Sequence, residues 1–246
     1  MSELWIPADW RAPPGVFAGC TTRIGGISTG IYESLNLGDH VGDDPLAVVE
    51  NRQRFKAMCD LPAEPRWLSQ VHGSDVARDP EAGTEADAAV TALADSVCVV
   101  MVADCLPVLF ASADGREIAA AHAGWRGLAA GVLESTVAAF AVPAGEIRAW
   151  LGPAISAAEF EVGEEVRDAF CSFDGTAITC FRRNDRGRWQ ADLYGLARQR
   201  LDRAGVTEVS GGGLCTYRDQ DRFFSYRRDG QCGRMAAFVF RRAENA

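Results

Sequence analysis

The sequence predicts a mixed-sheet α/β or α+β fold in one domain over residues 1–246, rather than a doubly wound parallel fold. Short apolar stretches rich in β-branched residues alternate with stretches of helical period, without strict βαβ regularity. The length of 246 residues suffices for one large domain. No internal repeat and no linker rich in Gly, Ser and Pro divides the chain.

The N-terminal half begins with loops and strand fragments. Turn-forming residues punctuate the first 45 positions, which disfavours helix there. Asp44 and Pro45 then predict the start of a helix that runs to about Met58, because proline is favoured in a first helical turn. The stretch 96–112 is apolar and β-branched and predicts two consecutive strands, and 117–125 predicts the next.

In the C-terminal half, stretches with helical spacing of apolar residues alternate with stretches typical of strands. A helix is expected after Gly127, where apolar residues recur at helical spacing, and another after Asp192, a favourable N-cap residue. Gly205 stands where a helix C-cap glycine belongs. The other expected elements are a strand at 146–151, a short helix at 162–170, and strands at 209–217 and 235–242.

Composition argues against several classes of protein. The net charge is −9 and Lys56 is the only lysine, so no basic tract supports nucleic-acid binding. No run of eighteen apolar residues predicts a membrane span, and the N-terminus does not resemble a signal peptide, so we expect a cytoplasmic protein. The eight cysteines include no CxxC pair, which favours reduced, mostly buried thiols. Neither a monomer nor a dimer is favoured.

Three segments place polar residues at the ends of apolar strands: 68–76 with His72, 101–110 with Cys105, and 119–131 with His122. Two imidazoles and a thiolate match the ligands that zinc accepts, and a fourth position would stay open for water or substrate. The spacing matches no compact zinc motif, however, and a lone histidine or cysteine on a strand is more often structural. The spacing of these residues alone therefore favours structural roles over a metal site.

The motifs QVHG, ADCLPV and HAGWRG, followed by LGPAIS and EFEVGEEV, resemble the laccase-domain family. This family is also called the multicopper polyphenol oxidase or purine nucleoside phosphorylase family and includes proteins like the peptidoglycan editing factor. The resemblance extends to residues 21–44 and 215–234, so it covers nearly the whole chain. It implies zinc held by His72, Cys105 and His122. It also implies an α/β sandwich of layered mixed sheets, of the type found in cytotoxic-necrotizing-factor-like cysteine hydrolases.

The histidine count separates the activities that the family names suggest. A multicopper oxidase couples a blue copper to a trinuclear centre, which together take on the order of ten histidines, largely in His-x-His pairs. This chain has three histidines and no such pair, which excludes that machinery. A single copper in place of zinc could still give weak oxidation, because copper binds most N/S sites more tightly.

The resemblance favours purine nucleoside chemistry: phosphorolysis of adenosine, inosine, guanosine and methylthioadenosine, with adenosine deamination. Phosphorolysis requires cations that hold the phosphate, and planar guanidinium groups suit this task. Arg23 and Arg126 are the first candidates because glycines surround them and the family motifs include them. Further candidates for phosphate or base contacts are Asn36, His40, Gln70, Phe223, Phe224, Tyr226, Arg227, Arg228 and Arg234.

A cysteine hydrolase acting on peptidoglycan precursors is the alternative. Cys105 would be the nucleophile and His122 the base, with Asp104 or Gln70 orienting the pair. A zinc-bound thiolate is a poor nucleophile, so the two uses of Cys105 compete, and we favour the zinc enzyme. Asp75 is the candidate carboxylate to orient His72.

Overall fold

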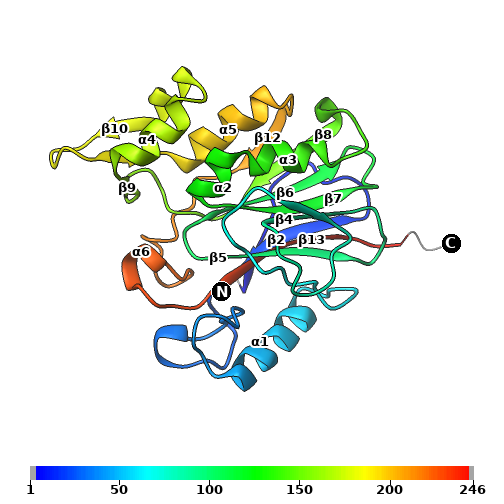
Figure 1. Ribbon diagram of the computed structural model, residues 1–246. Coiled ribbons are helices and arrows are strands. Elements are labelled where there is room, and N and C mark those ends of the chain that lie inside the picture. The colour runs from blue at the N-terminus through cyan, green and yellow to red at the C-terminus, as the bar shows by residue number, and fades with distance from the viewer. Residues whose placement is uncertain (1–3, 244–246) are drawn as a thin grey trace.

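Two β-sheets packed face to face form the centre of the computed structural model, which describes residues 4–243 (Figure 1). The larger sheet has the order β12 (Glu208–Gly211), β8 (Ile147–Leu151), β6 (Leu106–Ser112), β7 (Ile118–Ala123), β4 (Ala88–Thr91), β3 (Val76–Arg78). The smaller sheet has the order β1 (Trp5–Pro7), β2 (Val16–Thr21), β13 (Met235–Arg241), β5 (Val97–Val102). In the larger sheet, β12 runs parallel to β8 and β3 to β4, while the other pairs are antiparallel, so the predicted mixed sheet is confirmed.

Side-chain alternation along β5 and β13 explains why the two sheets stack. Cys98, Val100 and Val102 of β5 face the larger sheet, whereas Val97 and Val99 face the opposite way. β13 alternates in the same manner. Because successive strand residues point to opposite faces, a strand that is apolar at every position must be covered on both sides.

Helices supply the two outer layers. The outer face of the larger sheet packs against α2 (Trp125–Ala130), α3 (Val132–Ala138), α4 (Glu164–Cys171) and α5 (Leu193–Arg203). The smaller sheet is covered by α1 (Pro45–Met58), which lies on the opposite side of the molecule (Figure 1) and inserts Phe55 against Phe238. The layers therefore follow the order helix, sheet, sheet, helix.

The remaining elements are short. A three-stranded antiparallel sheet consists of β10 (Phe181–Arg183), β11 (Trp189–Ala191) and β9 (Glu161–Val162). Short helical segments are η1 (Gly30–Tyr32), η2 (Ala144–Glu146), η3 (Gly175–Cys180) and α6 (Tyr226–Asp229). No helix within residues 4–243 is both long and apolar enough to cross a membrane.

Most predicted elements are confirmed, and their start signals act as expected. The Asp44 side chain caps α1 by accepting from the Leu46 N–H at 2.9 Å, and Asp192 caps α5 by accepting from the Gly195 N–H at 3.0 Å. The strands expected over 96–112, 117–125 and 146–151 appear as β5, β6, β7 and β8.

Two expectations are wrong, and glycine explains both. The single helix expected after Gly127 is split into α2 and α3 at Gly131, whose φ of +98° is left-handed. The strand expected over 209–217 ends at Gly211, because Gly211, Gly212 and Gly213 have φ of +74°, +87° and +81°. A run of three left-handed residues turns the chain away from the ladder, so β12 ends with the first of them.

Candidate metal centre

Strand register brings two of the three candidate ligands together. In the antiparallel pair of β6 and β7, Pro107 lies opposite His122, and Leu106 lies opposite Ala123. Cys105, one residue before β6, is therefore beside the end of β7 that carries His122. His72 approaches from the loop before β3, which lies at the far edge of the same sheet. Sixteen residues separate Cys105 from His122 in sequence, but sheet pairing makes them neighbours.

The geometry of the three residues fits a tetrahedral ion. The candidate ligand atoms of His72, Cys105 and His122 all lie within 4.8 Å of one another, and His72 Nε2 is 3.9 Å from Cys105 Sγ. Zinc bonds of about 2.3 Å to sulfur and about 2.0–2.1 Å to nitrogen place tetrahedral ligand atoms about 3.4–3.6 Å apart. The site therefore needs only a small contraction to hold zinc. The two imidazole rings are nearly perpendicular, at 81°.

A carboxylate that sequence reasoning missed holds two of these ligands. Asp87 Oδ1 lies 2.8 Å from His122 Nδ1, and both side chains are buried. The same carboxylate accepts the backbone N–H groups of Val71, His72 and Gly73 at 3.1, 3.0 and 2.6 Å. Asp87 thereby leaves His122 Nε2 free for a metal and anchors the loop that carries His72.

Asp87 owes its place to the sheet. It immediately precedes β4, and β4 pairs with β7 such that the His122 N–H donates to the Asp87 carbonyl at 2.7 Å. The signal in the sequence was an acidic residue directly before the apolar run AAVT. Asp75, which the sequence indicated for His72, lies in the same loop with an exposed side chain.

The loop backbone at the site is strained. His72 has φ of +63° and Asp104 has φ of +88°, a region that residues other than glycine rarely adopt. Such conformations cost of order 1–3 kcal/mol each and persist where surrounding contacts dictate them. For His72, the three N–H groups bound by Asp87 are those contacts.

The electrostatics favour a thiolate. Burial alone would raise the pKa of the Cys105 thiol, but the neighbouring His122 and His72 lower it to about 6. Burial opposes charge on His122 as well, yet Cys105 and the hydrogen bond to Asp87 raise the pKa of that imidazole to about 9. A deprotonated thiol is the form that binds metal.

Gly124 keeps the space between the ligands open. A Cβ atom at this position would lie 3.0 Å from Cys105 Sγ and 3.0 Å from His72 Cδ2. We expect Gly124→Ala to weaken zinc binding by about tenfold or more, since overpacking costs about 1–3 kcal/mol. Competition with a chromogenic chelator measures the affinity. The change Gly145→Ala, at a position where a Cβ meets no atom within 4 Å, is the control and should bind zinc as the wild type does. An unchanged affinity in Gly124→Ala would contradict the assignment.

The three ligands open on a cavity of about 300 Å³. Besides the ligands, its walls are formed by His40, Gln70, Met101, Val102, Ala103, Tyr226 and Arg234. The Gln70 amide is fixed by two hydrogen bonds to the Met101 backbone, at 2.9 and 2.7 Å. This cavity is called the metal cavity below. Of the residues expected at the site, His40, Gln70, Tyr226 and Arg234 line it.

Asp104 faces away from the ligands. Its carboxylate accepts from Thr216 Oγ1 at 2.6 Å, from Ser225 Oγ at 3.0 Å and from the Arg227 N–H at 2.7 Å. These bonds tie the end of β5 to the C-terminal segment that carries Tyr226. These contacts give Asp104 a positioning role, and the catalytic role expected from its place beside Cys105 stays a prediction.

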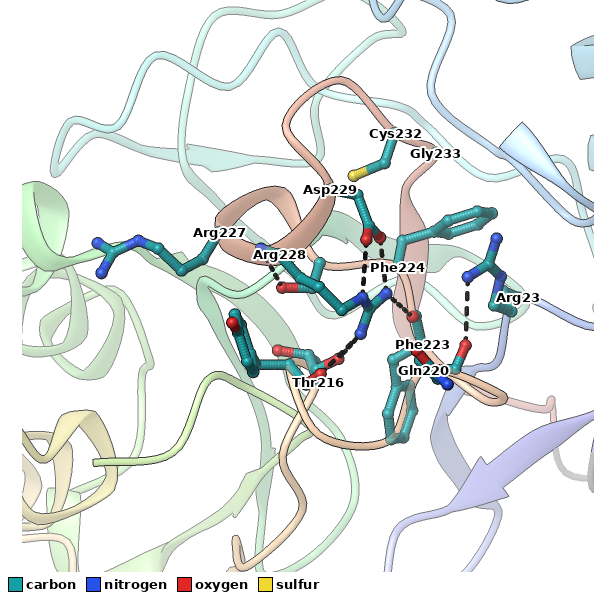
Figure 2. A network of polar contacts seen from close by, with 12 residues as sticks. Arg23, Thr216, Gln220, Phe223, Phe224, Arg227, Arg228, Asp229, Cys232 and Gly233 are labelled. Atoms are coloured by element: carbon teal, nitrogen blue, oxygen red, sulfur yellow. Dashed lines mark hydrogen bonds and ion pairs between the residues drawn. The ribbon is translucent and has the colours of Figure 1, made fainter. Parts of the chain in front are cut away.

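Arg23 and Arg228 line a different cavity, of about 450 Å³. Figure 2 shows Arg228 bound to both oxygens of Asp229 and to backbone carbonyls, including Thr216 O at 2.9 Å and Phe223 O at 2.9 Å. Arg23 donates to Glu33 O and Gln220 O, at 2.7 and 3.2 Å. Most of the donors of these two arginines are used to hold the chain together.

The other two candidate arginines also lie outside the walls of the metal cavity. Arg126 stacks over the ring of its neighbour Trp125, with 4.5 Å from Cζ to the ring centroid. Arg227 extends away from the Arg228 network (Figure 2) and donates to Glu161 O at 2.8 Å. Arg234 is the candidate arginine that the fold places at the metal cavity.

Phe224 and Asn36, which the sequence indicated for substrate contacts, are both buried and do not line the metal cavity. Phe224 is fully buried and Arg23 covers its ring, so it offers no face to a base. Asn36 is fully buried as well, and its amide bonds to Gly38 and Asp43 and to the Arg234 N–H. The exposed aromatic ring at the metal cavity belongs to Tyr226.

Residues 17–242 match the sequence profile of the family described as multi-copper polyphenol oxidoreductase laccase. The chain belongs to this family. An Escherichia coli K12 relative named purine nucleoside phosphorylase YfiH is 53% identical over 243 residues, which cover 98% of this chain and 99% of the relative. A purine nucleoside phosphorylase of Pseudomonas aeruginosa is 52% identical over 238 residues, which cover 96% and 98%.

Solved structures of laccase-family relatives have the same fold. A Neisseria meningitidis protein superposes with a TM-score of 0.94 at 50% identity, covering 98% of this chain and 100% of that one. YlmD from Geobacillus stearothermophilus superposes with a TM-score of 0.91 at 30% identity, covering 99% and 98%. The family recognised from sequence motifs is thus confirmed. With three histidines, this laccase-family chain nevertheless lacks the ligands of a multicopper centre.

Proposed function

We propose that this protein is a zinc-dependent purine nucleoside phosphorylase that also deaminates adenosine and phosphorolyses methylthioadenosine. The observation that carries the proposal is the open ligand set: two histidines and one cysteine converge at the wall of a cavity with one coordination position to spare. The name that the relatives share supports the substrate class. Zinc in this site would supply Lewis-acid chemistry, which polarises substrate oxygens and lowers the pKa of a bound water.

The cavity residues have the functions that such a substrate requires. The exposed ring of Tyr226 offers a purine base a stacking surface. The guanidinium of Arg234, 6.0 Å from the Tyr226 ring centroid, supplies positive charge beside that surface. Its Nη1 donates to the carbonyl groups of Cys232 and Gly233, so its direction is fixed. Asp87 binds Nδ1 of His122, so Nε2 is the nitrogen left for a metal, which would displace the proton from it on binding.

Two measurements test the proposal. Metal analysis of zinc-supplemented protein should find about one equivalent of zinc, as expected for one mononuclear site, and the same analysis for copper identifies the alternative metal. Incubation of inosine with phosphate should release hypoxanthine, and omission of phosphate should prevent it. A panel with adenosine, guanosine and methylthioadenosine defines the substrate range. Stoichiometric zinc without any phosphate-dependent base release would reject the phosphorylase proposal.

A specific contact supports a second candidate, the cysteine hydrolase. Cys105, His122 and Asp87 form a chain in which the thiol lies near the imidazole and the carboxylate binds its other nitrogen at 2.8 Å. This is the arrangement of a cysteine nucleophile with an oriented base. Hydrolysis of a muropeptide amide bond by protein stripped of metal would favour this candidate. Activity that returns only with added zinc would exclude it.

A further inference from the structure

A second cavity lies directly beside the metal cavity. It has a volume of about 430 Å³, and His40 and Gln70 belong to the walls of both. Its other walls are formed by Asp39, Arg52, Trp67, Leu68, Ser69, Ala82 and Gly83. The metal cavity, at about 300 Å³, is at the small end of ligand pockets, which hold about 300–1,000 Å³. One nucleoside would fill it and leave little room for a second reactant.

Asp39 lies between the Arg52 guanidinium and the His40 imidazole at the junction of the two cavities. Its Oδ2 lies 3.3 Å from Arg52 Nη2, and its Oδ1 lies 3.5 Å from His40 Nδ1. The Asp39 side chain is 61% exposed, so it can turn into solvent. A carboxylate held loosely between an arginine and a histidine marks the position where the oxygens of an anionic ligand would lie.

Arg52 is well held for this task. Its side chain is only 17% exposed, its guanidinium carbon lies 4.2 Å from the centroid of the Trp67 ring, and its Nε donates to Leu37 O at 3.0 Å. Among residues 4–243, the charged partner of Nη2 is Asp39, at 3.3 Å, whose own side chain is mostly exposed. A guanidinium that is fixed by stacking and paired with an exposed carboxylate is preorganised for an oxyanion that replaces this carboxylate.

We infer that Arg52 and His40 form an oxyanion subsite that takes a phosphoryl group next to the metal cavity, in exchange for the carboxylate of Asp39. The inference rests on the proposed function in naming the ligand: the free phosphate that attacks the nucleoside, or the phosphate ester of a nucleotide. Either presents at least three oxygens and so can contact both donors at once. The subsite differs from the Arg23 and Arg126 positions that the sequence favoured.

The test is direct binding of inorganic phosphate to the zinc-loaded protein, measured by isothermal titration calorimetry without turnover. Arg52→Gln should weaken binding by about tenfold or more, as expected for a charge-assisted hydrogen bond. Asp39→Asn should tighten binding by about fivefold, because it removes a unit charge a few ångströms from the ligand. A purely structural Arg52–Asp39 pair would not predict this second result.

Arg54→Gln is the matched control. Arg54 lies on the same helix as Arg52 and pairs with Glu50 at 2.8 Å, but it lines neither cavity, so its loss should not change phosphate binding. The zinc content of every variant reports whether the fold is intact. If Arg52→Gln does not fold, Asp39→Asn alone still tests the inference. Tighter phosphate binding cannot result from damage to the fold, which would weaken binding.

A second titration with inosine 5′-monophosphate distinguishes the two sources of the phosphoryl group. If phosphate shows the expected changes, the ligand is the free co-substrate. If only the nucleotide shows them, the subsite takes a phosphate ester. If the affinity for neither ligand responds to Arg52→Gln and Asp39→Asn, the inference is overturned, even where phosphorolysis itself is observed. Binding with the expected changes but no phosphorolysis would instead reject the proposed function and leave the subsite standing.

Discussion

Replacing Cys105 with alanine is expected to abolish stoichiometric zinc binding and, with it, phosphate-dependent cleavage of inosine. The thiolate is one of three ligands, and the remaining His72 and His122 cannot hold zinc against water at micromolar concentration. Zinc binding to structural sites is worth about 10–16 kcal/mol, so the loss of one ligand should weaken the affinity by at least about a hundredfold. Metal analysis after dialysis and the rate of hypoxanthine release measure the two effects.

Cys171→Ala provides the control for this substitution. Cys171 is also partly exposed, but it lies at the end of α4 and is no member of the ligand cluster. It should retain wild-type zinc and activity. Full activity in a Cys105→Ala protein that has lost its zinc would refute the metal enzyme. Loss of activity with zinc still bound would instead indicate a direct chemical role for the thiol.

Asp87→Asn is expected to raise the zinc dissociation constant by about 10–100-fold, the usual cost of losing a carboxylate behind a histidine ligand. The substitution keeps the size of the side chain but removes its charge and one acceptor. Asp87 binds the imidazole of His122 and three N–H groups of the His72 loop, so both ligands lose support. Chelator competition measures the affinity, and denaturant unfolding measures the accompanying loss of stability.

Asp75→Asn separates this role from the general effect of an acidic residue near the site. Asp75 is in the same loop, but its side chain is exposed. Its substitution should change zinc affinity less than about twofold, as usual for an exposed position away from the ligands. Equal losses in both variants would show that the carboxylate on His122 has no special role in the site.

The sequence predicted much of the fold because local signals are strong here. The caps Asp44 and Asp192 start helices where expected, and the apolar run of 96–112 forms two consecutive strands, one in each sheet. Short-range turn geometry was harder to read. Gly131 and Gly211 each end an element, because their left-handed conformations depend on neighbours that periodicity does not reveal.

The candidate site divides in a similar way. The candidate ligands His72, Cys105 and His122 could be named because the motifs around them are specific, and the structure brings their ligand atoms within 4.8 Å of one another. Side chains that act around the ligands were harder to assign. Arg23 and Phe224 lie within the segments that resemble the family, yet Arg23 lines another cavity and Phe224 is buried.

By itself, then, the sequence determined the family, the mixed sheets, the three candidate ligands and the exclusion of a multicopper centre, because each depends on local motifs or on a count of residues. Only the tertiary structure decided that Asp87 supports the ligands, that Tyr226 and Arg234 face the metal cavity, and that Arg52 lies beside it. These residues reach the site through strand pairing and layer packing. Such contacts join distant parts of the chain, and no local pattern encodes them.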